Sequence, residues 1–118
     1  MLDTDVLIDV DRGREELPDF PCFISVITLY EFIRGKVDPV RSKELLEEIC
    51  ITIPLSNEVI KRASLIWREL RRKGQVMEER DLLIGVTSIV SGLPLWTRNR
   101  KHFSKLERYG LVFWEYGL

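Results

Sequence analysis

The sequence predicts a single α/β domain, and three observations support this prediction. Strand-like apolar runs alternate with helix-like segments along the whole chain, a pattern typical of domains built around a parallel sheet. The chain has 118 residues, of which 45% are hydrophobic, and this length suits one core. No internal repeat, low-complexity tract or linker interrupts the sequence, so we expect one domain over residues 1–118.

The N-terminal segment predicts a short strand followed by a helix. The strand is expected to end at Asp3, directly after the first apolar residues of the chain. Thr4 or Asp5 can cap a helix over residues 6–12, because their side chains accept hydrogen bonds from N–H groups of the first turn. Gly13 can end that helix, since glycine readily takes the left-handed conformation found at helix ends.

A second apolar run, rich in β-branched residues, predicts a strand over residues 20–27. Thr28 and Glu31 have the T-x-x-E spacing of a capping box, which predicts that a short helix begins at this point. That helix is expected to close at Gly35.

Two residues in the middle of the chain predict the next helix. Asp38 can serve as its cap, and Pro39 suits the first helical position, where no N–H group is needed. The helix is expected to run to about Glu48, and a strand should follow over residues 51–54.

The remaining elements follow from caps and apolar spacing. Ser56 can cap a long helix whose apolar residues recur every three or four positions until Gly74. A strongly apolar helix is expected from about Glu79 to Ser91, where Gly92 ends it. Two short strands should complete the sheet, at residues 93–97 and 111–114.

Acidic or amide side chains occur where these elements meet. They are Asp3, Glu31, Asp81 and Asn99. Strand ends and helix starts share one edge of an open α/β sheet, so we expect these residues to converge although they are distant in sequence. Carboxylates a few ångströms apart repel by roughly 3 kcal/mol at an effective dielectric of about 20. A divalent cation would remove that penalty.

Each of these residues also has an ordinary structural interpretation. Asp3 can be a helix cap, and Glu31 is already explained by the capping box. Asp81 can be a favourable first-turn charge, and Asn99 can be a turn residue.

Cysteine, histidine and charge content exclude several other classes of protein. Cys22 and Cys50 lie inside apolar runs without CxxC spacing, which predicts buried reduced thiols and a cytoplasmic protein. The single histidine, His102, follows two cations, so we expect a surface or packing role. The net charge of −1 excludes a wholly basic nucleic-acid binder, although it permits a basic rim around an acidic pocket. No run approaches ~20 consecutive apolar residues, so no membrane span is expected.

Four segments resemble, in order and spacing, the motifs of the PIN-domain family, and specifically its VapC-type toxin ribonucleases. They are LDTDVLID at 2–9, ISVITLYEFIRG at 24–35, ERDLLIG at 79–85 and LPLWTRNRKHF at 93–103. The resemblance spans nearly the whole chain and implies a three-layer α/β/α sandwich with a short parallel sheet. It also implies metal-dependent endonucleolytic cleavage of RNA.

The resemblance assigns roles to individual residues. Asp3, Glu31 and Asp81 are expected to hold Mg²⁺ or Mn²⁺, and Asn99 stands where many relatives have a fourth catalytic acid. Supporting residues around this site are expected at Thr4, Asp5 and Thr97. The flanking cations expected to bind RNA are Arg34, Lys36, Arg98, Arg100 and Lys101. The expected partners are a VapB-like antitoxin and a second copy of the chain in a homodimer.

The sequence departs from the family pattern at three positions. Asp5 stands where relatives commonly have asparagine, which adds a negative charge. Asn99 removes one, so a second metal ion would be held weakly. Gly85 replaces the usual alanine, which costs ~1 kcal/mol in an exposed helix.

Three other interpretations of the sequence are open. D-T-D-V also resembles the opening of haloacid-dehalogenase-like phosphatases, but that fold needs a larger domain. A receiver domain of this size would need an aspartate after its central strand, and none is present in IPLSNEV. A PIN-like module that binds RNA or protein without cleavage would retain the carboxylates without using a metal.

Overall fold

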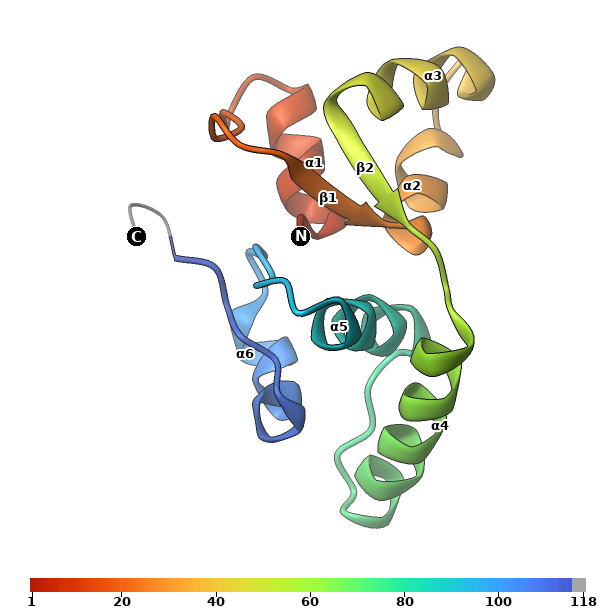
Figure 1. Ribbon diagram of the computed structural model, residues 1–118, viewed down its shortest axis with the longest axis vertical. Coiled ribbons are helices and arrows are strands. Elements are labelled where there is room, and N and C mark those ends of the chain that lie inside the picture. The colour runs from red at the N-terminus through yellow and green to blue at the C-terminus, as the bar shows by residue number, and fades with distance from the viewer. Residues whose placement is uncertain (116–118) are drawn as a thin grey trace.

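The computed structural model describes residues 1–115, in which helices cover both faces of a parallel sheet (Figure 1). The elements in the first half are α1 (Thr4–Asp11), β1 (Cys22–Ser25), α2 (Val26–Ile33), α3 (Pro39–Ile49) and β2 (Cys50–Ile53). Those in the second half are α4 (Asn57–Arg72), α5 (Glu79–Ser91), α6 (Arg100–Phe103) and the 3₁₀ helix η1 (Ser104–Tyr109).

The sheet consists of the parallel pair β1–β2, extended by single-residue bridges. Leu2 bridges in parallel to Ile24 on one side and to Trp96 on the other, and Leu95 bridges to Phe113. The five segments therefore lie in the order β2, β1, Leu2, 95–96 and 113. The strands predicted at 93–97 and 111–114 are thus present only as single-residue bridges, at Leu95, Trp96 and Phe113.

Alternation of side chains along these segments creates two apolar layers. Met1 and Leu95 face a core formed mainly with α4 and α5, whereas the adjacent Leu2 and Trp96 face a core formed with α1, α2 and α3. Successive strand residues point to opposite faces of a sheet, so the sheet is the middle layer. The predicted α/β/α sandwich follows from this arrangement.

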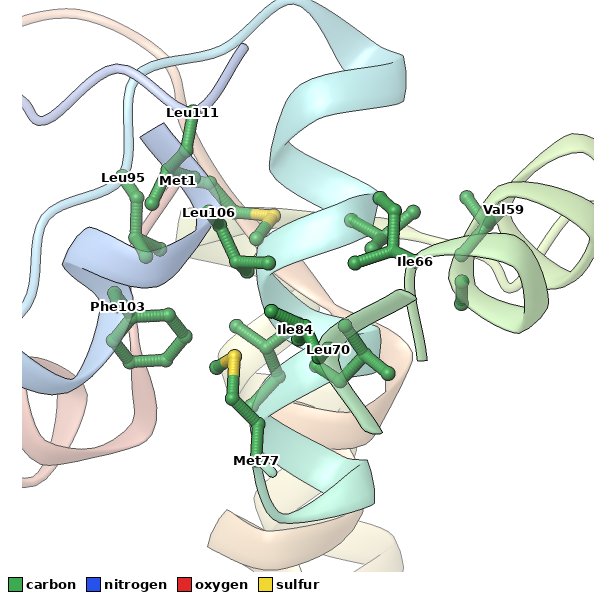
Figure 2. Packing of buried hydrophobic residues seen from close by; sticks show 13 residues of the cluster. Met1, Val59, Ile66, Leu70, Met77, Ile84, Leu95, Phe103, Leu106 and Leu111 are labelled. Carbon is green, nitrogen blue, oxygen red and sulfur yellow. The ribbon is translucent and has the colours of Figure 1, made fainter. Parts of the chain in front are cut away.

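Figure 2 shows the α4–α5 core, into which η1 and α6 also send side chains. Gly85 lies at a close contact in this core, because a Cβ atom there would be 2.3 Å from Cδ1 of Leu106. Glycine at this position therefore avoids a steric clash with Leu106. The sequence-based interpretation was incomplete, because it considered only the helix propensity that Gly85 loses.

The caps of the first two helices differ from the prediction. Asp3 caps α1 by accepting a hydrogen bond from the Thr4 N–H group, so neither Thr4 nor Asp5 is the cap. Ser25 caps α2 by accepting from the Thr28 N–H group at 3.0 Å. The capping box predicted for Thr28 and Glu31 is therefore wrong. Glu31 lies in the second turn of α2, so a capping role does not account for an acid at this position.

The later helices begin and end close to the predicted residues. Asp38 accepts a hydrogen bond from the Arg41 N–H group and caps α3, and Ser56 caps α4 in the same way. Gly74 and Gly92 follow α4 and α5 with positive φ angles of 68° and 66°, as expected for C-terminal glycines.

Cys22 and Cys50 are buried and unpaired, as predicted. Within residues 1–115, every helix is too short or too polar to cross a membrane.

Candidate active site

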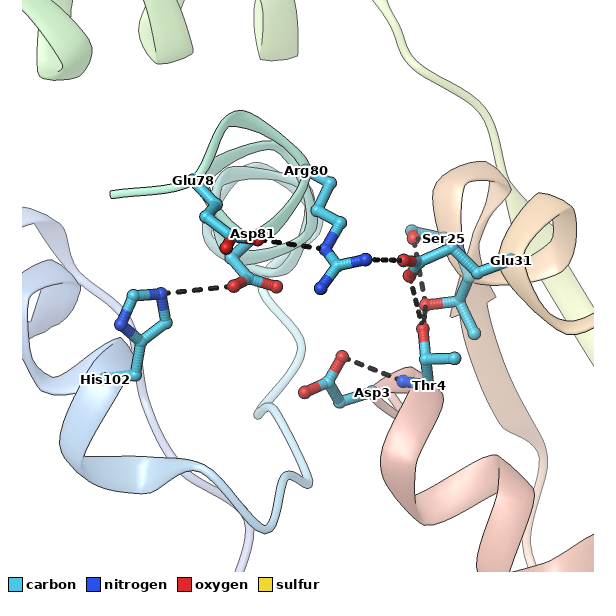
Figure 3. Close-up of polar contacts among 9 residues, drawn as sticks. Asp3, Thr4, Ser25, Glu31, Glu78, Arg80, Asp81 and His102 are labelled. Carbon is cyan, nitrogen blue, oxygen red and sulfur yellow. Dashed lines mark hydrogen bonds and ion pairs between the residues drawn. The ribbon is translucent and has the colours of Figure 1, made fainter. Parts of the chain in front are cut away.

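Three of the four predicted acidic or amide residues come together in a cavity of about 330 Å³ beside the start of α1. Asp3, Glu31 and Asn99 line this cavity. Asp81 lies outside its lining, but its charge acts on both Asp3 and Glu31, and Figure 3 shows the three carboxylates around one region. Side chains from separate segments of the sequence therefore lie around one region, with Asp81 beside the cavity and not in its lining.

Asp3 is both a helix cap and a member of the acidic cluster. Its Oδ1 atom accepts from the Thr4 N–H group, and its Oδ2 atom accepts from Oγ1 of Thr97, each at 2.8 Å. Its residue surface is only 7% exposed. Burial, and to a smaller extent the nearby Asp5, raise the pKa of Asp3 to about 6, although the two hydrogen bonds oppose the rise. The two hydrogen bonds thus orient the Asp3 carboxylate, but they only partly offset the cost of burying its negative charge.

Glu31 is held from two sides. Oγ1 of Thr4 donates to Oε1 of Glu31 at 2.7 Å, and Nη1 of Arg80 lies 2.9 Å from Oε2. Oγ1 of Thr28 lies 3.2 Å from the Thr4 hydroxyl, and the Ser25 hydroxyl lies 3.4 Å from that of Thr28. These contacts fix the orientation of the Glu31 carboxylate between α1 and α5.

Asp81 projects from the first turn of α5 toward α6. Its Oδ2 atom lies 3.1 Å from Nε2 of His102. Burial raises the pKa of Asp81, whereas His102 and Arg80 lower it. The predicted surface or packing role of His102 overlooked this contact, since only the fold brings α6 beside α5.

Asp5 and Asn99 complete the lining of the cavity. Oδ2 of Asp5 accepts from the Arg98 N–H group at 3.2 Å, while its Oδ1 atom is buried without a hydrogen-bond partner among the described residues. Burial raises the pKa of Asp5. The Asn99 N–H group donates to Oγ1 of Thr97 at 3.0 Å, and its side chain does not cap α6.

Cations at the cavity differ partly from those predicted. Arg34 lines it, and so does Arg80, which the sequence analysis missed. The only sequence signal for Arg80 was its position directly before Asp81 in ERDLLIG. Three predicted RNA-binding residues instead form ion pairs within the protein: Lys36 with Asp11, Arg98 with Asp9 and Glu15, and Arg100 with Glu115. Lys101 is exposed on α6.

The donor set fits a hard divalent cation. Carboxylate oxygens suit Mg²⁺ and Mn²⁺. A cation at this site would also offset the cost of burying the Asp3 charge and the Oδ1 atom of Asp5, which has no hydrogen-bond partner among the described residues. Within residues 1–115, no three acidic, histidine or cysteine side chains already have the spacing of a metal site. In this arrangement Glu31 is paired with Arg80, and Asp81 lies next to His102.

Comparison with known proteins identifies the family. No protein-family model matches the chain. Ribonuclease VapC1 of Methanocaldococcus jannaschii is 37% identical over 119 residues, which cover 98% of this chain and 86% of the relative. The chain belongs to the VapC ribonuclease family. The resemblance to VapC-type toxins found in the sequence is thereby confirmed.

Solved structures agree with this assignment to the VapC fold. VapBC2 from Rickettsia felis, bound to a promoter DNA fragment, matches with a TM-score of 0.77 and 22% identity, over 97% of both chains. A toxin–antitoxin complex from Klebsiella pneumoniae matches with a TM-score of 0.70 and 28% identity, over 87% of this chain and 88% of the other. The predicted fold class is therefore confirmed.

Proposed function

We propose that this VapC is an endoribonuclease that depends on Mg²⁺ or Mn²⁺. Asp3, Glu31 and Asp81 would hold the cation, and Asn99 would lie beside it. The observation that carries the proposal is that Asp3, Glu31 and Asn99 line one cavity and that Asp81 lies close enough to interact electrostatically with Asp3 and Glu31, with Asp3 buried and its pKa raised to about 6. A bound divalent cation supplies polarisation of the phosphoryl oxygen and an activated water.

The protein's own residues would orient the ligands and the substrate. The hydroxyl groups of Thr4 and Thr97 hold Glu31 and Asp3 through hydrogen bonds of 2.7 and 2.8 Å. Arg34 lines the cavity and can contact a phosphate of the RNA backbone. Lys101 on α6 is exposed and can extend that contact.

An RNA cleavage assay with Mn²⁺ tests the proposal. The Asp81→Asn protein should stay folded and lose cleavage, because it removes one ligand charge without changing side-chain size. Glu79→Gln is a matched control, since Glu79 is an acid in the same turn of α5 but lines the groove between α4 and α5. Unchanged cleavage by Asp81→Asn would remove this residue from the mechanism. RNA binding without any cleavage by the wild-type protein would favour the non-catalytic module.

We also propose a VapB-like antitoxin and a second copy of the chain as partners, in the cytoplasm where unpaired thiols persist. Several solved neighbours are VapBC complexes, which supports the antitoxin. An apolar groove of about 510 Å³ between α4 and α5, lined by Ile60, Trp67 and Leu83, supports the homodimer. Analytical ultracentrifugation of the wild-type and Trp67→Glu proteins tests it, since a charge in this groove should yield monomers.

A further inference from the structure

Arg80 links two elements of the site across the cavity. Its side chain extends from the first turn of α5, and Nη1 lies 2.9 Å from Oε2 of Glu31 in α2 (Figure 3). Its Nε atom lies 3.2 Å from Oε2 of Glu78. The guanidinium therefore has two acidic partners at once, one in the site and one outside it.

The exposure of the two partners differs strongly. The Arg80 side chain is 53% exposed, whereas that of Glu31 is 10% exposed. Arg80 thus approaches Glu31 from the solvent side, while Thr4 holds the other carboxylate oxygen from α1. Both oxygens of Glu31 are thus engaged, Oε1 by the Thr4 hydroxyl group and Oε2 by the partly exposed Arg80 side chain.

A divalent cation bound to Oε2 of Glu31 would compete with the Arg80 guanidinium for the negative charge of that oxygen. Their charges repel each other at short range, and the repulsion is substantial even near the protein surface. Arg80 can leave Glu31 without losing every ion pair, because Glu78 remains next to it. The geometry therefore permits an exchange in which the incoming cation replaces Arg80.

We propose that Arg80 is the counter-ion of Glu31 in the metal-free site and that a divalent cation displaces it, so that Arg80 sets the metal affinity. This inference rests on the proposed metal-dependent function. It assigns to Arg80 a role in lowering the affinity for metal, in contrast to the ligands, which raise it. Removing the guanidinium should therefore strengthen metal binding.

Calorimetric titration of the metal-free full-length chain with Mn²⁺ tests the proposal. Arg80→Gln should bind Mn²⁺ about tenfold more tightly, since about 1.4 kcal/mol of repulsion is removed. Arg80→Lys, which keeps the charge, should bind within about threefold of the wild-type protein. Arg68→Gln is the control for net charge, because Arg68 lies on α4 in the other groove. Equal or weaker binding by Arg80→Gln would overturn the proposal.

A second measurement needs no metal. In chelator, Arg80→Gln should lower the melting temperature of the wild-type protein and have a smaller effect in a Glu31→Gln background, because only the ion pair with Glu78 remains to be lost there. Equal effects in both backgrounds would overturn the ion pair as the basis of the proposal. Absence of Mn²⁺ binding in every variant would overturn the metal-dependent function itself, whereas binding that is insensitive to Arg80→Gln would overturn only the role of Arg80.

Discussion

Replacing Asp3 with asparagine is expected to stabilise the metal-free protein while removing its metal binding. Asp3 is 7% exposed, and burial is the largest cause of its raised pKa. Asparagine has the same shape without the charge, and its side-chain oxygen can still cap α1 by accepting from the Thr4 N–H group. The substitution therefore removes the buried charge but keeps the cap.

The expected gain in stability follows from the pKa of Asp3. A rise from 3.8 to about 6 corresponds to ~3 kcal/mol of destabilisation when the carboxylate is ionised. Weakening the hydrogen bond from Thr97 should return ~1 kcal/mol of that gain. A net increase of about 1–2 kcal/mol in the free energy of unfolding remains, or about 4–8 °C in melting temperature for a chain of this length.

The sign of the pH dependence is fixed by the direction of the shift. The pKa of Asp3 is higher in the folded than in the unfolded chain, so the folded state binds more protons between the two values. Stability of the wild-type protein relative to Asp3→Asn therefore falls as pH rises from about 4 to about 6. The advantage of the variant should be complete above that range and disappear below it.

Urea denaturation in chelator, at pH 7.5 and at pH 4.5, measures this difference. Asp19→Asn serves as the control, since Asp19 is exposed in the loop before β1. A variant that is no more stable than wild type at pH 7.5, or an advantage that persists unchanged at pH 4.5, would refute the buried charge as the cause. Added Mn²⁺ should stabilise the wild-type protein and leave Asp3→Asn unaffected.

Three further substitutions test packing, orientation and RNA contact. Gly85→Ala should lower the free energy of unfolding by about 1–3 kcal/mol in urea denaturation, because overpacking against Leu106 exceeds the ~1 kcal/mol gain in helix propensity; adding Leu106→Ala should abolish this effect. Thr4→Val should reduce kcat/KM for RNA cleavage by about 10–100-fold through loss of the hydrogen bond to Glu31, while Thr4→Ser retains activity. Arg34→Ala should weaken RNA binding in filter-binding titrations and reduce the salt slope by about 0.7, as expected for one phosphate contact to single-stranded RNA; an unchanged slope would exclude this contact.

Local signals in the sequence predicted the later helices well. Asp38 and Ser56 are each the sole good cap before an apolar periodic segment, and both caps were confirmed. The first turn of α2 was misplaced because Ser25 and Thr28 can each serve as a cap, three residues apart. Pairing of β1 with β2 ends at Ser25, so the helix begins directly after this residue and Ser25 is the cap. Where this pairing ends depends on contacts between distant segments, which the local sequence does not reveal.

The same distinction explains which site residues were found. Asp3, Glu31 and Asp81 belong to motifs at element junctions, so their convergence followed from the topology of an α/β sheet. Arg80 and His102 contact Glu31 and Asp81 only because α5 lies beside α2 and α6. Charge–charge contacts of this kind depend on side-chain direction, which spacing along one element does not determine.

The chain's own residues compensate the negative charges of the three carboxylates in different ways. Glu31 has a cation, Asp81 has a histidine that carries charge only when protonated, and Asp3 has hydrogen bonds alone. Burial raises the pKa of Asp3 to about 6. Because a ligand must lose its proton to bind metal, Asp3 should set the lower pH limit of metal affinity, while Arg80 should set its magnitude above that limit. The pH limit of metal binding and the metal affinity above that limit would then be controlled by separate residues. The Asp3→Asn and Arg80→Gln proteins distinguish these two effects.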